Sequence, residues 1–194
     1  MDTLQLPWTE YIPHKPTPKQ LAFLLLTNRE ALYGGAAGGG KSDALLMAAL
    51  QYVNVPGYSA LLLRRSYTDL ALPGALMSRA REWLMPSSAA WRDGMKTWVF
   101  PSNATITFGY LERPGDEYRY QSTEFQFIGF DELTQFNENQ YRYLFSRLRR
   151  TSEVSVPLRM RAASNPGGIG HEWVRERFID AEGVVEGRIF IPAS

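Results

Sequence analysis

The sequence predicts an α/β domain in which helices cover both faces of a central, mostly parallel sheet. Short apolar segments alternate with helix-forming segments along the chain, which is the pattern of proteins built on a parallel sheet. A glycine-rich run follows the first short apolar strand segment and leads straight into a helix-forming segment. The chain has 194 residues, of which 44% are apolar and 21% charged, and this is typical of one globular domain with a sizeable core.

The amino-terminal half begins with an expected extended arm over residues 1–16, which are rich in proline and aromatic residues. Thr17 can cap a helix that Pro18 opens and that continues through the apolar residues 21–26. The remaining elements expected in this half are a short strand at 31–33, a helix at 43–53, a buried strand at 59–65 and a helix at 69–85 that Pro73-Gly74 interrupts near its start.

A β-hairpin is expected in the middle of the chain, inserted among the strands and helices. Residues 98–100 and 105–108 have the residue types of strands, and they flank the turn residues 101–104. No internal repeat or linker divides the chain, so residues 1–194 are expected to form a single domain. The later elements expected are a strand at 125–130, a helix at 138–149, a strand at 158–163 and a helix at 171–179.

Composition excludes several classes of site. The chain has no cysteine, which rules out disulfides and thiolate metal sites, and its two histidines are too few for a histidine metal cluster. The net charge of +1 does not indicate a strongly basic nucleic-acid binder, although it is compatible with a local basic face. No apolar run reaches membrane-spanning length, and the amino terminus has no apolar signal core. We therefore expect a cytosolic protein with no membrane partner.

The glycine-rich run at residues 34–42 is the most specific feature of the sequence. It contains the pattern G-x-x-x-x-G-K-S between a strand and a helix, the context that a phosphate-binding loop needs. Backbone N–H groups of such a loop surround the phosphates of ATP, the lysine contacts the β- and γ-phosphates, and the serine hydroxyl holds Mg²⁺. A flexible linker is the alternative, but linkers rarely end in Lys-Ser and run into an apolar helix. The expected nucleotide-binding residues are Gly35, Gly38, Gly39, Gly40, Lys41 and Ser42, with Ser42 also a metal ligand.

Two carboxylates follow the apolar strand expected at 125–130. Asp131 is expected to hold Mg²⁺ at the carboxyl end of this strand, directly or through water. Glu132 is expected to activate the attacking water as general base. Such a pair separates ATP hydrolysis from phosphate transfer to another acceptor. The alternative is a strand that ends in a solvated acidic turn, and the phosphate loop upstream favours the functional interpretation.

Two further polar residues are candidates for the same site. Asn165 follows Ser164 at the end of the strand expected at 158–163, where its amide could contact the γ-phosphate or the attacking water; the alternative is an Asn-Pro turn. Gln20 lies in the helix before the phosphate loop, and its paired donor and acceptor could read the edge of adenine. The alternative for Gln20 is a residue on the surface of a helix.

Six segments occur in an order and spacing that is strongly specific; they lie at residues 11–20, 33–42, 118–122, 130–134, 143–149 and 164–168. Together they resemble the ATPase domain of the large terminase subunit of tailed bacteriophages, the motor that pumps DNA into the procapsid. The resemblance implies a P-loop NTPase fold of the RecA-like, ASCE type, with ATP and Mg²⁺ as cofactors. It also implies double-stranded DNA, the portal protein and the small terminase subunit as partners. A homo-oligomeric ring would act in the cytoplasm of the infected bacterium, from a viral or prophage gene, while an isolated subunit could be a monomer.

The chain departs from this family in two ways. Large terminases normally carry a nuclease domain with an acidic metal cluster after the ATPase domain, whereas this chain ends at Ser194. A truncated chain, a split gene product or a remnant would explain that ending. Many relatives have an arginine in the phosphate loop where Ala37 stands here, so a catalytic arginine would come from elsewhere, such as a neighbouring subunit. Arg119 is the first candidate and Arg147 the second, with structural ion pairs as the alternative for both.

Arg64 and Arg65 follow the strand expected at 59–65, and their role is open at this point. They could face DNA or couple to the nucleotide. Solvated side chains or ion pairs are the alternative.

Three other functions are compatible with a phosphate loop. A helicase or another P-loop DNA translocase with two fused motor domains needs more length than 194 residues provide. A P-loop kinase needs an acceptor pocket and a lid, and it usually lacks the Asp-Glu pair. A remnant that binds nucleotide with little turnover stays open as a third alternative, although the residues for chemistry, Lys41, Ser42, Asp131 and Glu132, are all present.

Overall fold

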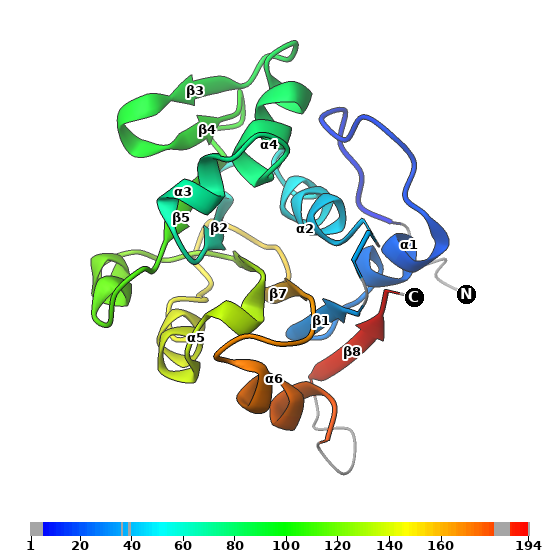
Figure 1. Cartoon of the computed structure of the whole chain (residues 1–194). Helices are drawn as coiled ribbons and strands as arrows, with labels where there is room; N and C mark the ends of the chain where they lie inside the picture. Colours follow the sequence, from blue (N-terminus) through cyan, green and yellow to red (C-terminus); the bar gives the residue numbers. More distant parts are fainter. Residues whose placement is uncertain (1–5, 36, 39, 181–186, 194) are drawn as a thin grey trace.

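The computed structural model places eight strands in one sheet, in the order β3-β4-β5-β2-β6-β7-β1-β8 (Figure 1). It describes residues 6–35, 37–38, 40–180 and 187–193. The strands from β5 to β8 in this order run parallel, whereas β3 and β4 form an antiparallel ribbon that extends the sheet beyond β5. The strands are β1 (Glu30–Gly34), β2 (Ser59–Arg64), β3 (Ala90–Arg92), β4 (Thr97–Val99), β5 (Thr105–Tyr110), β6 (Phe127–Asp131), β7 (Arg159–Ser164) and β8 (Arg188–Pro192).

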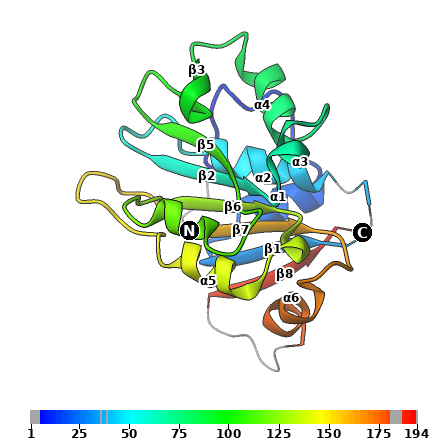
Figure 2. The same ribbon diagram turned by 60° about the vertical axis from the view of Figure 1, so that its left-hand side comes forward.

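Helices cover both faces of the sheet (Figure 2). On one face, buried residues of α1, α2 and α4 form an apolar cluster with the sheet, and on the other face residues of α5 and α6 form a second cluster. The predicted α/β fold with a mostly parallel sheet is therefore confirmed. The helices are α1 (Pro18–Leu24), α2 (Lys41–Leu50), α3 (Tyr67–Ala71), α4 (Leu76–Leu84), α5 (Glu138–Phe145) and α6 (His171–Phe178), with short 3-10 helices η1 (Asp93–Met95), η2 (Asp116–Tyr120) and η3 (Leu133–Gln135).

Helix α2 lies against the sheet, and its sequence explains this position. Its residues 44–50 are alanine, leucine and methionine, and all of them are fully buried. A helix that is apolar on every side is stable only when other elements surround it. α2 therefore packs against β6, β7, α1 and α4, and this packing fixes the phosphate loop at its amino-terminal end.

The helix expected at 69–85 is two separate helices in the structure. α3 ends before Leu72, which precedes Pro73 and has ψ of 146°, an extended conformation. A residue before proline is disfavoured in the helical region, so the chain turns there and α4 begins three residues after Pro73.

The helix expected at 138–149 ends at Phe145, earlier than predicted. The residues that follow α5 pair instead with Phe125, just before β6. The Phe125 N–H donates to the Arg147 carbonyl (3.0 Å), and the Arg149 N–H donates to the Phe125 carbonyl (2.9 Å). Tertiary backbone pairing thus outweighs the helical pattern of this segment.

The predicted β-hairpin is confirmed as β4 and β5, but five short elements of the structure, β3, β8, η1, η2 and η3, were not predicted. β3 pairs with β4, and β8 pairs with β1 at the opposite edge of the sheet. η2 lies in the segment between β5 and β6. Each is only three to five residues long, too short to show a clear periodicity.

The arm is described from residue 6 onward and contains no helix or strand up to residue 16. It is anchored to the domain rather than free. The Thr9 hydroxyl donates to the Leu50 carbonyl (3.0 Å), and the buried ring of Tyr11 packs edge-on against Phe100. Within the described residues, no helix is long and apolar enough to cross a membrane.

Candidate nucleotide site

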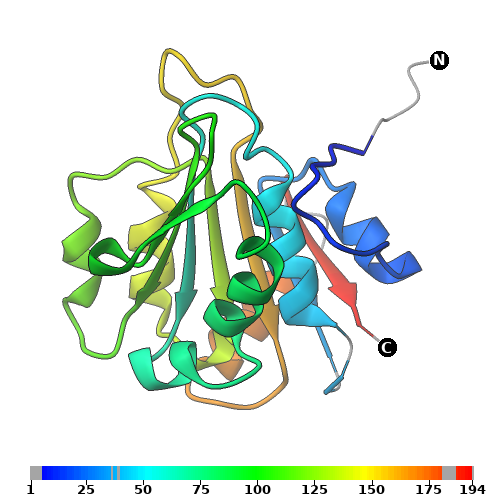
Figure 3. The ribbon, with the colours of Figure 1, turned by 90° about the horizontal axis from the view of Figure 1, so that it is seen from above.

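The parallel strands direct their carboxyl ends to one edge of the sheet (Figure 3). Most of the expected site residues follow three neighbouring strands there, β1, β7 and β6. The register pairs Gly34 of β1 with Ser164 of β7, and Ala163 of β7 with Asp131 of β6. The loops after these strands therefore leave the sheet side by side. In open parallel sheets, the crevice at this end is where ligands bind.

The phosphate loop runs from β1 into α2. The Gly35 N–H donates to the Ser164 carbonyl (3.2 Å), which joins the start of the loop to β7. Gly40 has φ of 64°, and a Cβ atom there would lie 2.5 Å from Gln20 Nε2, so glycine is favoured at this position. Lys41 is the first residue of α2 and is buried, and the amino-terminal end of such a helix attracts anions. Of the other expected loop residues, Gly38 is exposed and Gly39 lies outside the described residues.

Gln20 connects α1 to the phosphate loop. Its side chain is buried, its Nε2 donates to the Gly40 carbonyl (2.9 Å), and its Oε1 accepts from the Thr17 N–H (2.9 Å). The Thr17 hydroxyl in turn accepts from the Gln20 N–H, which completes a capping box at the start of α1. Both polar groups of the Gln20 amide are engaged in this arrangement, so its expected contact with adenine would require one of them to be exchanged.

A cavity of about 610 Å³ adjoins the phosphate loop. The arm, the start of α1, the end of β1 and the first turn of α2 surround it. A cavity of this size is sufficient for a nucleotide base and ribose. Its lining includes His14, Lys15, Pro18, Gln20, Tyr33 and Gly40.

Asp131 is buried beside the start of α2. Its Oδ1 accepts from the Ser42 hydroxyl (3.1 Å), and its Oδ2 accepts from Arg64 Nη1 (2.9 Å). Burial raises the pKa of the Asp131 carboxyl above its ordinary value, although the Arg64 charge and the two side-chain hydrogen bonds act to lower it. A carboxylate in this position gains from an additional positive charge.

The residues at this point fit a magnesium ion. Ser42 and Asp131 offer oxygen atoms 3.1 Å apart, and the Oδ1 atom of Asn165 is buried without a hydrogen-bond partner. Mg²⁺ prefers oxygen ligands and is usually held by one or two protein groups together with phosphates and water. Among the described residues, no group of three or more acidic or histidine side chains could hold a metal by itself.

Glu132 takes a left-handed backbone conformation, with φ of 57°, at the turn between β6 and η3. Such a conformation is uncommon for a residue with a side chain and often occurs at functional sites. Asn165 Nδ2 donates to Glu132 Oε1 (3.3 Å). The amide therefore contacts the carboxylate that the sequence predicts to be the general base.

A network of hydrogen bonds connects the turn after β6 to the end of β7. Thr134 N donates to Ser164 Oγ (3.2 Å), and Thr134 Oγ1 donates to the Asn165 carbonyl (3.2 Å). Further along, the Gly170 N–H donates to the Thr134 carbonyl (2.6 Å). The segment that carries Asn165 is thus fastened to the segment that carries Glu132.

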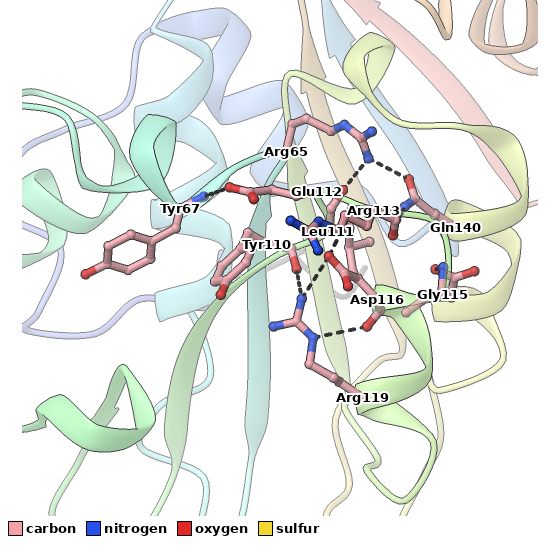
Figure 4. Close-up of polar contacts among 11 residues, drawn as sticks. Arg65, Tyr67, Tyr110, Leu111, Glu112, Arg113, Gly115, Asp116, Arg119 and Gln140 are labelled. Carbon is pink, nitrogen blue, oxygen red and sulfur yellow. Dashed lines mark hydrogen bonds and ion pairs between the residues drawn. The ribbon is translucent and has the colours of Figure 1, made fainter.

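Arg119 does not lie among these residues. It is in η2, after β5, and β5 is two strand spacings from β6 and four from β1, about 10 Å and about 19 Å at the usual spacing of about 4.8 Å. Its Nη2 donates to the Tyr110 carbonyl (2.9 Å) and lies 3.2 Å from Asp116 Oδ2 (Figure 4). The side chain is 46% exposed. Arg147, the second candidate, lies two residues after α5 and donates to the Gln121 carbonyl (2.5 Å).

A second cavity, of about 670 Å³, lies between α4 and the β3–β4 ribbon. Its lining includes Met77, Arg81, Trp91 and Trp98. None of the expected site residues contributes to it, so size alone does not locate the nucleotide. Of the two cavities, the one beside the phosphate loop has expected nucleotide-binding residues in its lining, namely Gln20, Gly38 and Gly40.

The sequence alone does not predict the partner of Arg64. Arg64 ends β2, and it contacts Asp131 because β2 and β6 are neighbours in the sheet. The sequence shows two arginines after an apolar strand, and this pattern does not indicate that a carboxylate is the partner of Arg64.

Comparison with known proteins identifies the family. Residues 32–174 match the family model described as "Terminase large subunit, T4likevirus-type, N-terminal". No curated protein sequence matches the chain. The large terminase ATPase domain of Thermus phage P74-26 (an alanine mutant) is 15% identical, with 94% of this chain and 82% of that chain covered and a TM-score of 0.65.

Two longer structures extend the comparison. The large terminase of bacteriophage HK97 is 13% identical, with 78% of this chain and 33% of that chain covered and a TM-score of 0.61. A large terminase of a thermophilic bacteriophage in complex with ATP-gamma-S is 10% identical, with 94% and 43% covered and a TM-score of 0.62. The chain thus spans less than half the length of these terminases. At such low identity the structures show the shared RecA-like fold, and the family match shows that the chain belongs to the large terminase subunit family and corresponds to its amino-terminal part.

Proposed function

We propose that this chain is the ATPase domain of a large terminase and that it hydrolyses ATP to move double-stranded viral DNA into a procapsid. Two contacts carry the proposal: Ser42, at the end of the phosphate loop, contacts Asp131, and Asn165, which follows β7, contacts Glu132, the residue next to Asp131. The family membership supports the packaging role. Structures of a large terminase with ATP-gamma-S and with ADP support a nucleotide ligand.

Each residue has a stated role in this proposal. The N–H groups of the phosphate loop and the Lys41 ammonium bind the phosphates. Ser42 and Asp131 hold Mg²⁺, which neutralises phosphate charge when it is bound. Glu132 accepts the proton of the attacking water, and Asn165 holds the Glu132 carboxylate in position. Gln20 fixes the loop through Gly40 and reads adenine when the base enters the adjoining cavity.

Arg119 is proposed to act on the nucleotide of a neighbouring subunit. The phosphate loop has Ala37 where relatives have an arginine, and Arg119 lies exposed and away from its own site. An arginine supplied by a neighbour typically contributes about 10³–10⁵-fold in rate. This proposal requires a ring, which in the packaging machinery would contact the portal protein, the small terminase subunit and DNA inside the infected cell.

The test is ATPase activity against protein concentration, with and without duplex DNA. We expect low specific activity in dilute protein and a rise as subunits assemble. Lys41→Ala is the control, because it removes a phosphate-binding charge and should abolish nucleotide binding with an unchanged melting temperature. Near-normal turnover by Lys41→Ala would contradict the site. Tight nucleotide binding with no turnover at any concentration would favour a remnant instead.

A further inference from the structure

The last residue of β2 and the residue after it contact two different regions. Arg64 ends β2 and donates to Asp131 of its own nucleotide site (2.9 Å). Arg65 points to the other side, where its Nη1 donates to the Leu111 carbonyl and to Gln140 Oε1 (3.3 Å) (Figure 4). Consecutive residues of an extended chain project to opposite sides, which explains the two directions.

Leu111 begins the Arg119 segment, which we define as residues 111–121. Arg119 within it is held by the carbonyl of Tyr110, and Tyr110 pairs with Arg64 in the β2–β5 register. At its far end the segment is held by Arg147, whose Nη1 donates to the Gln121 carbonyl (2.5 Å). The segment is therefore attached at its start to the end of β2 and at its end to the residues that follow α5.

The two residues that Arg65 contacts are buried, whereas Arg119 is exposed. Leu111 and Gln140 are fully buried, whereas the Arg119 side chain is 46% exposed. Gln140 also accepts from the Asn137 N–H (3.4 Å) in the capping box of α5, so the group that Arg65 contacts is itself fixed. Because the contacts of Arg65 are buried and hydrogen-bonded, they can fix the position of the segment and so of the exposed Arg119 side chain.

We propose that Arg65 is a positioning residue for Arg119, and that its neighbour Arg64 ties the same strand end to the Asp131 carboxylate. The pair thereby joins a subunit's own nucleotide site to the arginine that it presents to the next subunit. This inference rests on the proposed function, since it requires Arg119 to act on a neighbour. Loss of Arg65 should therefore impair hydrolysis in the neighbouring subunit and leave a subunit's own site competent.

The test mixes variant subunits in equal amounts and measures ATPase activity at concentrations where the wild-type protein is active. Glu132→Gln subunits cannot hydrolyse ATP but present Arg119, whereas Arg119→Ala subunits keep Glu132 but cannot assist a neighbour. Arg65→Met removes the donors of Arg65 and keeps an apolar stem. The matched control is Arg113→Ala, which removes an exposed arginine of the same segment and should retain wild-type activity.

Arg65→Met alone should lose about 10- to 100-fold in activity, because displacement of a catalytic group by about 1 Å has effects of that size. Mixed with Glu132→Gln it should recover towards about a quarter of wild-type activity, the share of ring positions with a competent site and a competent neighbour. Mixed with Arg119→Ala it should stay low. Its affinity for Mg²⁺–ATP-gamma-S should equal that of the wild type.

Three outcomes would overturn the inference. Recovery of Arg65→Met with Arg119→Ala would show that Arg65 is not needed to present Arg119. Failure to recover with Glu132→Gln, when Arg119→Ala does recover with it, would place the role of Arg65 in its own site. Failure of Arg119→Ala itself to recover with Glu132→Gln would remove Arg119 from the proposed function, and this inference with it. If Arg65→Met does not fold, Arg65→Lys is mixed in the same way; if neither folds, Arg65 serves the fold alone and the inference is wrong.

Discussion

Two buried carboxylates lie at opposite ends of the sheet, and their surroundings neutralise them to different degrees. Glu30 begins β1, is 6% exposed, and accepts from Arg177 (2.8 Å), Arg188 (3.1 Å) and the Tyr141 hydroxyl (2.8 Å). Asp131 ends β6, is 1% exposed, and has one arginine and one hydroxyl as side-chain partners. The two sites thus differ by one positive charge.

The pKa values of the two carboxyls shift in opposite directions. For Glu30, burial favours the neutral acid, but hydrogen bonds from Arg177 and Tyr141 and the charges of both arginines outweigh it and lower the pKa. For Asp131, burial outweighs its partners and raises the pKa. The difference teaches that the surroundings of Glu30 stabilise its charged form, whereas those of Asp131 do so only in part, which is the arrangement expected of a carboxylate that binds a cation.

The largest expected loss of activity is for Glu132→Gln, a change to the residue that follows Asp131 at the carboxyl end of the sheet. The change keeps the shape of the side chain and removes the base, so nucleotide binding should persist while hydrolysis falls about 10²–10⁴-fold. Single-turnover kinetics and nucleotide titration measure the two quantities separately. Hydrolysis at the wild-type rate would show that Glu132 is not the base.

Glu30→Gln should affect stability rather than chemistry. It leaves Arg177 and Arg188 without their carboxylate, and breaking a buried ion pair costs about 3 kcal/mol of unfolding free energy. Urea unfolding measures this loss, and turnover well below the melting temperature should stay normal. The control is Glu124→Gln, an exposed position where the change should be below about 0.5 kcal/mol. Equal effects of both variants would contradict a structural role for Glu30.

Asp131→Asn should have the opposite pattern. In the absence of metal and nucleotide it removes a buried charge that is only partly neutralised, so the melting temperature should not fall. With nucleotide, the apparent affinity for Mg²⁺ should weaken about 10- to 100-fold, since one oxygen ligand of the proposed site loses its charge. A Mg²⁺ titration of nucleotide binding tests this. A large loss of stability without ligand would mean that Asp131 belongs to the fold as Glu30 does.

The smallest effect is the pH dependence of stability. Because the folded-state pKa of Glu30 is lowered, its stabilisation is fully present above the ordinary glutamate value of about 4.3 and is lost as the pH falls through the folded value. The difference in unfolding free energy between wild type and Glu30→Gln should therefore shrink below about pH 4. A difference that is constant from pH 7 to pH 3 would exclude ionisation of Glu30 as its cause.

The sequence predicted the parts of the site that are local in the chain. The phosphate loop with Lys41 and Ser42 was identified from its strand–loop–helix context, and Asp131, Glu132 and Asn165 from their places at strand ends. The fold class followed from the same alternation and is confirmed, whereas the roles of these residues stay predictions.

Long-range partners could not be predicted. Arg64 and Asp131 are 67 positions apart, and Arg177 and Glu30 are 147 apart, so no periodic pattern links them. The same reason explains the early end of α5, where backbone pairing with Phe125 competes with the helix.

The left-handed backbone of Glu132 has a consequence for protein engineering. A side chain at this φ costs on the order of 1 kcal/mol, which glycine would avoid and asparagine would reduce. A selection that rewards heat resistance alone should therefore replace Glu132 with one of these residues. If Glu132 has its proposed role as the base, the selected proteins would be stable but would no longer hydrolyse ATP, and stability compatible with turnover would have to be gained elsewhere in the chain.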